Sequence, residues 1–182
     1  RWALRAAAFF QDRRDLQVRI PDQLDPGDPT TFVFFTENAE RGRALGVEVE
    51  GRWQATDRLA LGLALGLLDA EIRQFSTRPE LEDRDYAHAP PYTANLNATY
   101  RLPAGWFVRA DLAARGPFYF DYCTTPDCRD PRSPAYRLLD LRAGREWGAW
   151  RAELFARNAL DERYATRGFF FGNEPPDFIP ET

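Results

Sequence analysis

This sequence is poor in histidine and cysteine, two residue types that often bind metals or act in catalysis. It holds one histidine, His88, and two cysteines, Cys123 and Cys128, in the segment CTTPDC. Nothing near the cysteines completes a metal-binding set, so a small disulfide in an oxidising compartment is favoured over two free thiols. No nucleophile stands at a recognisable spacing from a base. We therefore expect no enzyme, no metal site and no cofactor.

The charged residues offer a second chemistry, the pairing of guanidinium groups with carboxylates. All 24 basic residues are arginine, and 28 residues are acidic, which gives a net charge of −4. The planar guanidinium suits bidentate pairing with carboxylates, although codon bias explains this arginine usage equally well. With 44% hydrophobic residues, the balance indicates neither disorder nor a nucleic-acid partner.

The elements that must position these side chains have the periodicity of strands. The most apolar run, LALGLALGLL at 59–68, is shorter than the about 20 apolar residues of a membrane-spanning helix. With a period of two, it places leucines on one face and alanine and glycine on the other. Ten residues at about 3.3 Å each, tilted by about 45°, rise roughly 23 Å, close to the apolar band of an outer-membrane barrel.

The same alternation recurs along nearly the whole chain. One face is apolar, and the other carries amides and both signs of charge. We expect the polar face to line the lumen of a barrel. Its candidate lumen-facing residues are Glu48, Glu50, Arg52, Asn95, Asn97, Arg109, Asp111, Asp140, Arg142, Arg151, Glu153 and Arg157.

Turn signals divide the chain into eight expected strands, at about 2–11, 15–20, 31–55, 59–75, 91–102, 105–122, 135–147 and 149–171. The alternation is lost around 40–43, where we expect a bulge or break. Tight links at 12–15, 56–58, 102–105 and 146–149 alternate with long loops at 21–30, 76–90 and 123–133. Since each link reverses the chain, all the short turns should lie at one end of the sheet.

Several features favour lipid over a soluble core as the partner of the apolar face. Some strands exceed the five or six residues usual in soluble sheets, and short turns oppose long loops as in outer-membrane barrels. Beyond Leu67 the outward positions become Asp69 and Glu71, as expected where a strand leaves lipid. A soluble β-sheet binding module stays the alternative, because it also needs one apolar face. Aromatic residues near the tight links would form an interfacial girdle: Trp53, Tyr100, Trp106, Trp147 and Trp150.

Three segments carry motifs that recur in one family. RNALDERYATRGFFF at 157–171 resembles an Asn-Leu-Phe-Asp-Glu-x-Tyr motif, with Ala159 and Leu160 in place of Leu and Phe. ENAERGRALGVEVEGRWQATDRL is similar to a Gly-Val-Glu-x-Glu strand with its short periplasmic turn, and HAPPYTANLNATYRLPAGW is similar to the strand that follows. Together, over nearly all 182 residues, they resemble TonB-dependent outer-membrane receptors.

The resemblance implies an all-β fold, an antiparallel up-and-down transmembrane β-barrel that has 22 strands in this family. Residues 1–182 would supply about eight of them, as the C-terminal portion of the barrel without the plug domain and the final strand. The implied function is active uptake of a large, scarce ligand, most often an iron-siderophore complex, energised through TonB. Expected partners are the N-terminal plug, the TonB complex of the inner membrane and the lipid of a Gram-negative outer membrane. A passive porin-type channel is the alternative.

In such a receptor, ligand selection would fall to the long loops and upper strand ends. Aromatic side chains with an arginine suit an anionic, ring-bearing chelate. For the lumen-facing charges, the alternative role is to brace the wall by pairing across strands. An interfacial belt is the alternative for the two later tyrosines, and a solvated loop position for the histidine. The candidates are Tyr86, His88, Arg115, Tyr119 and Tyr122.

Overall fold

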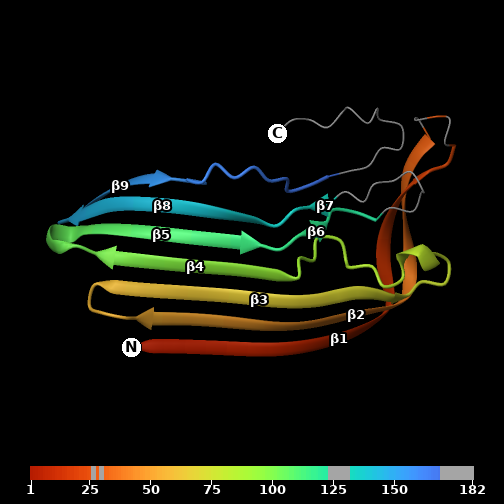
Figure 1. Ribbon diagram of the computed structural model, residues 1–182, viewed down its shortest axis with the longest axis horizontal. Helices are drawn as coiled ribbons and strands as arrows, with labels where there is room; N and C mark the ends of the chain where they lie inside the picture. Colours follow the sequence, from red (N-terminus) through yellow and green to blue (C-terminus); the bar gives the residue numbers. More distant parts are fainter. Residues whose placement is uncertain (26–27, 29–30, 123–131, 169–182) are drawn as a thin grey trace.

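The chain folds into one curved antiparallel sheet. The computed structural model describes residues 1–25, 28, 31–122 and 132–168. Seven strands lie in the order β1-β2-β3-β4-β5-β8-β9 (Figure 1). Their bounds are β1 Trp2–Gln23, β2 Phe32–Gln54, β3 Leu59–Gln74, β4 Tyr92–Arg101, β5 Trp106–Arg115, β8 Tyr136–Trp147 and β9 Trp150–Ala156. A two-stranded sheet, β6 (Phe118–Tyr119) with β7 (Arg132–Ser133), and the short helices η2 (Pro79–Leu81) and η3 (Pro103–Gly105) lie in the connections.

The strands run up and down, each beside the next strand of the main sheet. The short links β2–β3, β4–β5 and β8–β9 lie at one end, on the left of Figure 1, and the long connections lie at the other. This confirms the predicted separation of short turns from long loops. Among the described residues, none of the helices is long and apolar enough to cross a membrane.

The turn predicted at 12–15 is wrong, because β1 continues through this segment to Gln23. Its polar residues, which favour a turn in isolation, instead pair with β2, which is equally long. Arg41 donates from Nε and Nη2 to the two carboxylate oxygens of Asp12, both at 2.8 Å. Asp15 takes a left-handed φ of 53° where the pairing is interrupted. The main sheet therefore has seven strands, and the two expected at 2–11 and 15–20 are one.

Two further strand boundaries differ from the prediction, whereas the predicted break near 40–43 is confirmed by a register shift between Arg41 and Gly42. The strand expected to reach residue 122 ends at Arg115. Gly116 still donates its N–H to Tyr92 of β4, but the following proline has no N–H with which to continue the pairing. The last described strand ends at Ala156. Asn158 follows it with a φ of 48° and holds a turn by bonding through its amide to the backbone of Glu162.

The register places the predicted apolar residues together on one face. Leu63 lies opposite Leu96 on one neighbouring strand and Gly51 on the other. At the short-turn end, Trp53 pairs with Trp2, which extends the predicted girdle by one residue. Trp147 and Trp150 face each other in the same way across the last link.

At the long-loop end the apolar face becomes charged, as predicted. Arg43 is opposite Glu71 and forms ion pairs with Glu71 and with Asp69, the latter at 3.1 Å. Arg73 continues the group with contacts to Glu71 at 3.3 Å and Asp83 at 3.0 Å. The apolar band thus ends where the ion pairs begin.

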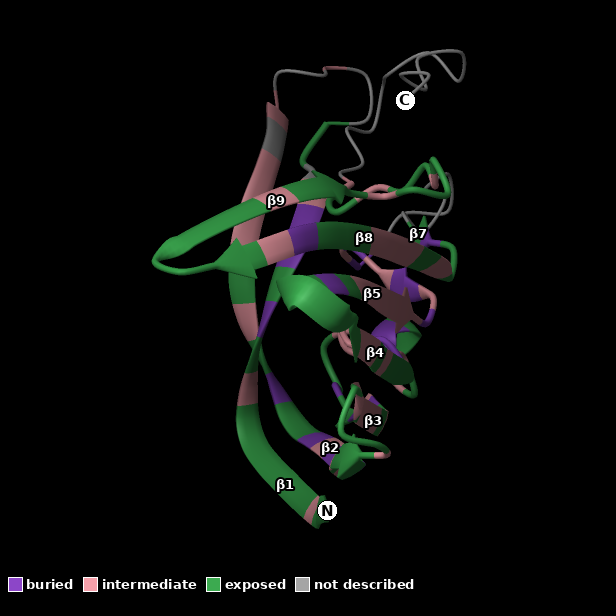
Figure 2. Cartoon of the chain, turned by 90° about the vertical axis from the view of Figure 1, so that its left-hand side faces the viewer, coloured by how far each residue is buried: buried purple, intermediate pink, exposed green. Residues whose placement is uncertain are grey.

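The distal part of the β1–β2 hairpin bends away from the sheet and runs across the long-loop ends of the other strands (Figure 1). Seen along the strands, the main sheet is an arc, and the distal hairpin lies on its concave side (Figure 2). A small core holds the hairpin there. The buried members of this core are Val18, Ile20, Ala39, Ile72, Phe75, Leu81 and Tyr122.

A pair of neighbouring substitutions tests which face meets lipid. In the full-length barrel, Leu63→Arg should lower the free energy of unfolding by about 2–4 kcal/mol, because it places a charge near the midplane of the apolar band. Ala64→Arg should cost far less, since Ala64 is opposite Glu50 and Asn95 on the polar face. Urea unfolding in lipid vesicles, followed by tryptophan fluorescence, measures both. Equal costs, or a larger cost at position 64, would contradict the assignment.

Candidate functional site

The polar side chains form a continuous charged surface on one face of the sheet. Across β4, β5 and β8, Asn97, Asp111 and Asp140 lie directly opposite one another. Together with polar residues of β1 and β2, this face surrounds a hollow of about 1210 Å³. Residues that line the hollow include Arg5, Glu50, Arg52, Asn95, Asn97, Thr99, Arg101, Arg109, Asp111, Glu146 and Arg151.

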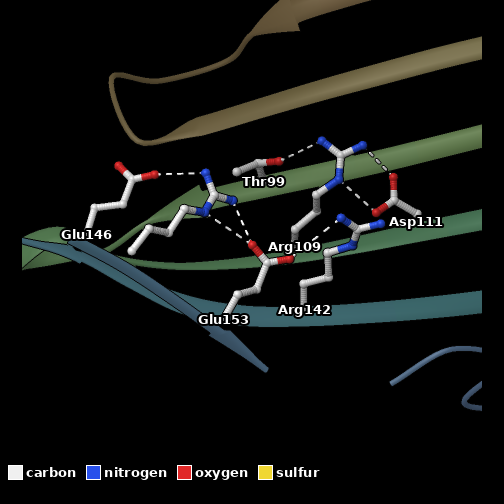
Figure 3. Close-up of polar contacts among 7 residues, drawn as sticks. Thr99, Arg109, Asp111, Arg142, Glu146 and Glu153 are labelled. Atoms are coloured by element: carbon white, nitrogen blue, oxygen red, sulfur yellow. Dashed lines mark hydrogen bonds and ion pairs between the residues drawn. The ribbon is translucent and has the colours of Figure 1, made fainter. Parts of the chain in front are cut away.

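The register creates like-charge pairs on this face that neighbouring groups must neutralise. Arg109 lies opposite Arg142, and Asp111 lies opposite Asp140, both of which are unfavourable pairings. Arg109 relieves this by donating from Nε to Asp111 at 2.7 Å, while its Nη1 reaches the hydroxyl of Thr99 at 3.4 Å (Figure 3). Neutralisation therefore runs along β5 rather than straight across the strands.

A second arginine network joins β8 and β9 (Figure 3). Arg151 contacts Glu146 at 3.0 Å and Glu153 at 2.8 Å, and Arg142 contacts Glu153 at 3.6 Å. Exposed ion pairs of this kind contribute only about 0–1 kcal/mol each. Their main effect is to fix side chains and cancel charge.

The charges on β2 are arranged differently. Glu48, Glu50 and Arg52 are exposed and lie opposite small residues of β3, namely Gly66, Ala64 and Gly62. Within the described ranges, none of the three is in an ion pair. The wall therefore combines a neutralised region on β5, β8 and β9 with a region on β2 whose charges remain open to another molecule.

The last predicted lumen residues lie close to the strand ends. Asp140 accepts a hydrogen bond from the backbone N–H of Asn158 at 2.9 Å. Arg157, one residue beyond β9, stacks its guanidinium over Phe155 at 5.4 Å. Both side chains thus secure the end of β9. The predicted lumen residue Asn95 lies in β4, opposite Ala64 of β3 and Ala113 of β5.

The five residues predicted to select a ligand come together at the long-loop end, but two of them serve packing. Tyr122 is buried, and its hydroxyl accepts a hydrogen bond from the N–H of Ala87 at 2.9 Å. Burial raises the pKa of Tyr122 to about 12. Tyr86 packs against the same small core, and burial also raises its pKa. These two rings hold the loop that carries His88.

The other three candidates form an arginine-aromatic cluster. The ring of Tyr119 contacts two guanidinium groups, those of Arg84 and Arg132, at 4.9 and 5.3 Å from the ring centroid. His88 is exposed, donates its backbone N–H to Tyr119 at 2.8 Å and has its own backbone at a φ of 59°. Such cation–π contacts hold guanidinium groups in fixed positions.

Two phenylalanines complete this cluster. Arg115 lies over Phe118 at 4.4 Å. The ring of His88 is 5.8 Å from Phe118 and 6.1 Å from Phe120, and the two phenylalanine rings meet edge to face at 5.2 Å. Sequence reasoning missed Phe118 and Phe120, as well as both arginines beside Tyr119. The run of three aromatic residues FYF after Pro117 was the signal that could have indicated Phe118 and Phe120.

Two predictions concern metals and thiols. Cys123 and Cys128 lie outside the described residues, so their disulfide stays a prediction. In the part of the chain that the structure describes, no group of three or more His, Cys, Asp or Glu side chains is arranged to hold a metal ion.

Comparison with known proteins places this sheet in a family. The model of the TonB-dependent receptor-like β-barrel matches residues 1–159, and the chain belongs to this family. The siderophore receptor PiuA from Acinetobacter baumannii is similar in structure, with a TM-score of 0.71 and 22% identity over 91% of this chain. The ferric yersiniabactin uptake receptor FyuA from Yersinia pestis has a TM-score of 0.70 and 21% identity over 93%. The copper transporter OprC has a TM-score of 0.69 and 14% identity over 90%.

These similarities confirm the predicted fold class. The chain spans about a quarter of the length of these structures, 23% of PiuA and 24% of FyuA and OprC, which agrees with an unclosed sheet of barrel strands. The family and these neighbours are receptors and transporters rather than enzymes, in agreement with the expectation of no enzymatic activity.

Removal of one hydroxyl tests the packing role of Tyr122. Tyr122→Phe should destabilise the 75–91 loop by about 1–3 kcal/mol, because the partly buried N–H of Ala87 loses its acceptor. Hydrogen exchange of that amide in the full-length protein measures the effect as lost protection. Tyr119→Phe is the matched control, since Tyr119 is held through its ring. Unchanged exchange in Tyr122→Phe would show that the bond does not hold the loop.

Proposed function

We propose that these strands belong to the wall of an outer-membrane receptor of a Gram-negative bacterium. The receptor takes up a large, scarce ligand, an iron-siderophore complex, with energy delivered through TonB. The observation that carries the proposal is the family match over most of the chain. It is joined to the concave shape of the sheet (Figure 2) and to a hollow whose lining includes charged and amide side chains. An apolar outer face against lipid and a polar inner face are what a barrel with a filled lumen requires.

The proposal includes the receptor's own plug domain as the partner of the polar face. The chain would be the C-terminal part of the barrel, with the plug supplied by the rest of the full-length protein. Glu50 and Arg52 face the hollow and form no ion pair among the described residues. Together with Glu48, on the same face of β2, they would contact the plug. The neutralised arginines of β5, β8 and β9 would instead keep the wall rigid and hydrated.

The ligand would meet the arginine-aromatic cluster around Tyr119 and His88 at the long-loop end. Two guanidinium groups and several ring faces suit an anionic complex that carries aromatic or heterocyclic groups. The neighbour PiuA is named as a siderophore receptor and FyuA as a ferric yersiniabactin uptake receptor, whereas OprC is named as a copper transporter. The proposal of iron-siderophore cargo follows the two receptors with the higher identity.

Energy dependence separates this receptor from a passive channel. In cells that express the full-length protein, we expect uptake of radioactive iron from a panel of ferric siderophores to fall to background when TonB is deleted. A passive porin-type barrel would keep its uptake, because diffusion needs no energy. Uptake that is independent of TonB, or absent for every siderophore in the panel, would contradict the proposal.

A substitution in the cluster tests ligand selection separately from transport. Tyr119→Ala should weaken binding of the transported complex to whole cells by about tenfold, as expected for a central aromatic anchor. Tyr92→Ala is the matched control, because Tyr92 is an aromatic residue at the same end of the sheet on the apolar face. Equal loss in both variants would indicate a general disturbance of the barrel and would contradict the assignment.

A further inference from the structure

One arginine lies on the apolar face, away from the charged wall. Arg145 is opposite Trp106 and Ala152 in the register, at the short-turn end of β8. The other residues of that girdle are aromatic, and the band next to it is aliphatic, with Val108 and Leu141 exposed. A guanidinium group at such a boundary has an apolar surface on one side and water on the other.

Three contacts fix the position of this guanidinium group. Its carbon lies 5.5 Å from the ring centroid of Trp106 and 5.9 Å from that of Trp147. Its Nε donates to the backbone carbonyl of Ala104, in the turn η3, at 3.1 Å. Gly105 allows this approach, because it has a φ of 79° and a Cβ there would collide with the carbonyl of Glu146. Among the described residues, only Nε of Arg145 is in a hydrogen bond, so both Nη groups can donate to a further acceptor.

The charge of Arg145 is not cancelled within the described residues. No carboxylate forms an ion pair with it there, whereas the nearby Arg142 and Arg151 share Glu153 on the opposite face. Glu146 follows Arg145 in the chain but points to that other face and contacts Arg151. A positioned cation without a carboxylate, beside two indole rings, is complementary to an anionic group held at the membrane boundary.

We propose that Arg145, Trp106 and Trp147 form a binding site for the phosphate of an anionic phospholipid in the leaflet at the short-turn end. The two Nη groups donate to the phosphate oxygens, and the acyl chains lie along Val108 and Leu141. The inference rests on the proposed membrane location but on neither cargo nor TonB. A phospholipid fits better than a free anion, because its acyl chains also cover the exposed aliphatic surface next to the guanidinium group.

The test counts phospholipids on the purified full-length protein by native mass spectrometry. The detergent-solubilised protein is titrated with phosphatidylglycerol and, separately, with zwitterionic phosphatidylethanolamine. We expect wild-type protein to prefer phosphatidylglycerol, and Arg145→Gln to weaken phosphatidylglycerol binding by about fivefold, the effect of one basic residue at an anionic surface. Arg58→Gln is the matched control, because it removes the same charge from a short turn at the same end.

The outcomes distinguish a lipid site from a site for free phosphate and from a general effect of surface charge. Unchanged phosphatidylglycerol binding in Arg145→Gln, or equal loss in Arg58→Gln, would overturn the site, and so would displacement of the lipid by inorganic phosphate at millimolar concentration. Should Arg145→Gln fail to form a heat-modifiable barrel on gels, Trp147→Leu keeps the charge and removes one ring. In that variant we expect a partial loss, and no loss would overturn the proposal. Because no cargo is involved, these results do not depend on the uptake experiments.

Discussion

Backbone hydrogen bonding is the constraint on which the rest of this structure depends. Within lipid, a strand has no water to satisfy its N–H and C=O groups, so its neighbours must do so. Strands β2 to β8 of the main sheet have a partner on each side, whereas β1 and β9 stand at its two ends. Continuous pairing also fixes the register, and the register decides which side chains share a face.

Alternate residues of each strand form two faces with different requirements: one face packs apolar side chains, and the other must neutralise charged ones. On the apolar face, leucines pack against leucines and glycines of adjacent strands, and aromatic rings mark the short-turn end. On the polar face, the register sets arginine opposite arginine and aspartate opposite aspartate. Contacts along a strand or diagonally between strands, such as Arg109 with Asp111 and Arg142 with Glu153, neutralise them. Charge cancellation on this face therefore comes from contacts along a strand and on the diagonal, as well as from direct opposition between Glu146 and Arg151.

The long-loop end has a separate source of stability. The bent β1–β2 hairpin buries Val18 and Ile20 against Phe75 and Leu81, so this end has an apolar core of its own. Arg78 adds polar contacts from the β3–β4 connection to Glu37 of the hairpin, at 3.1 Å. A platform built this way can position the rings around Tyr119 through contacts within this part of the chain.

Sequence alone determined the fold class, the two faces, the girdle and the separation of short turns from long loops. These features depend on local periodicity and turn composition, which each segment carries by itself. Loop position and residue type also sufficed to propose Tyr119, His88 and Arg115, but not the phenylalanines and the two arginines that complete their cluster.

Only the tertiary structure decided how contacts with neighbouring strands and loops change the conformation and role of each segment. The segment 12–15 has the composition of a turn, yet it stays extended because β2 is long enough to pair with it and Arg41 binds Asp12. Tyr86 and Tyr122 became packing residues because the hairpin bends over them, and no local pattern encodes that bend. Likewise, the pairing of Arg43 with Asp69 and of Arg142 with Glu153 depends on the register, because in each pair the carboxylate comes from the neighbouring strand.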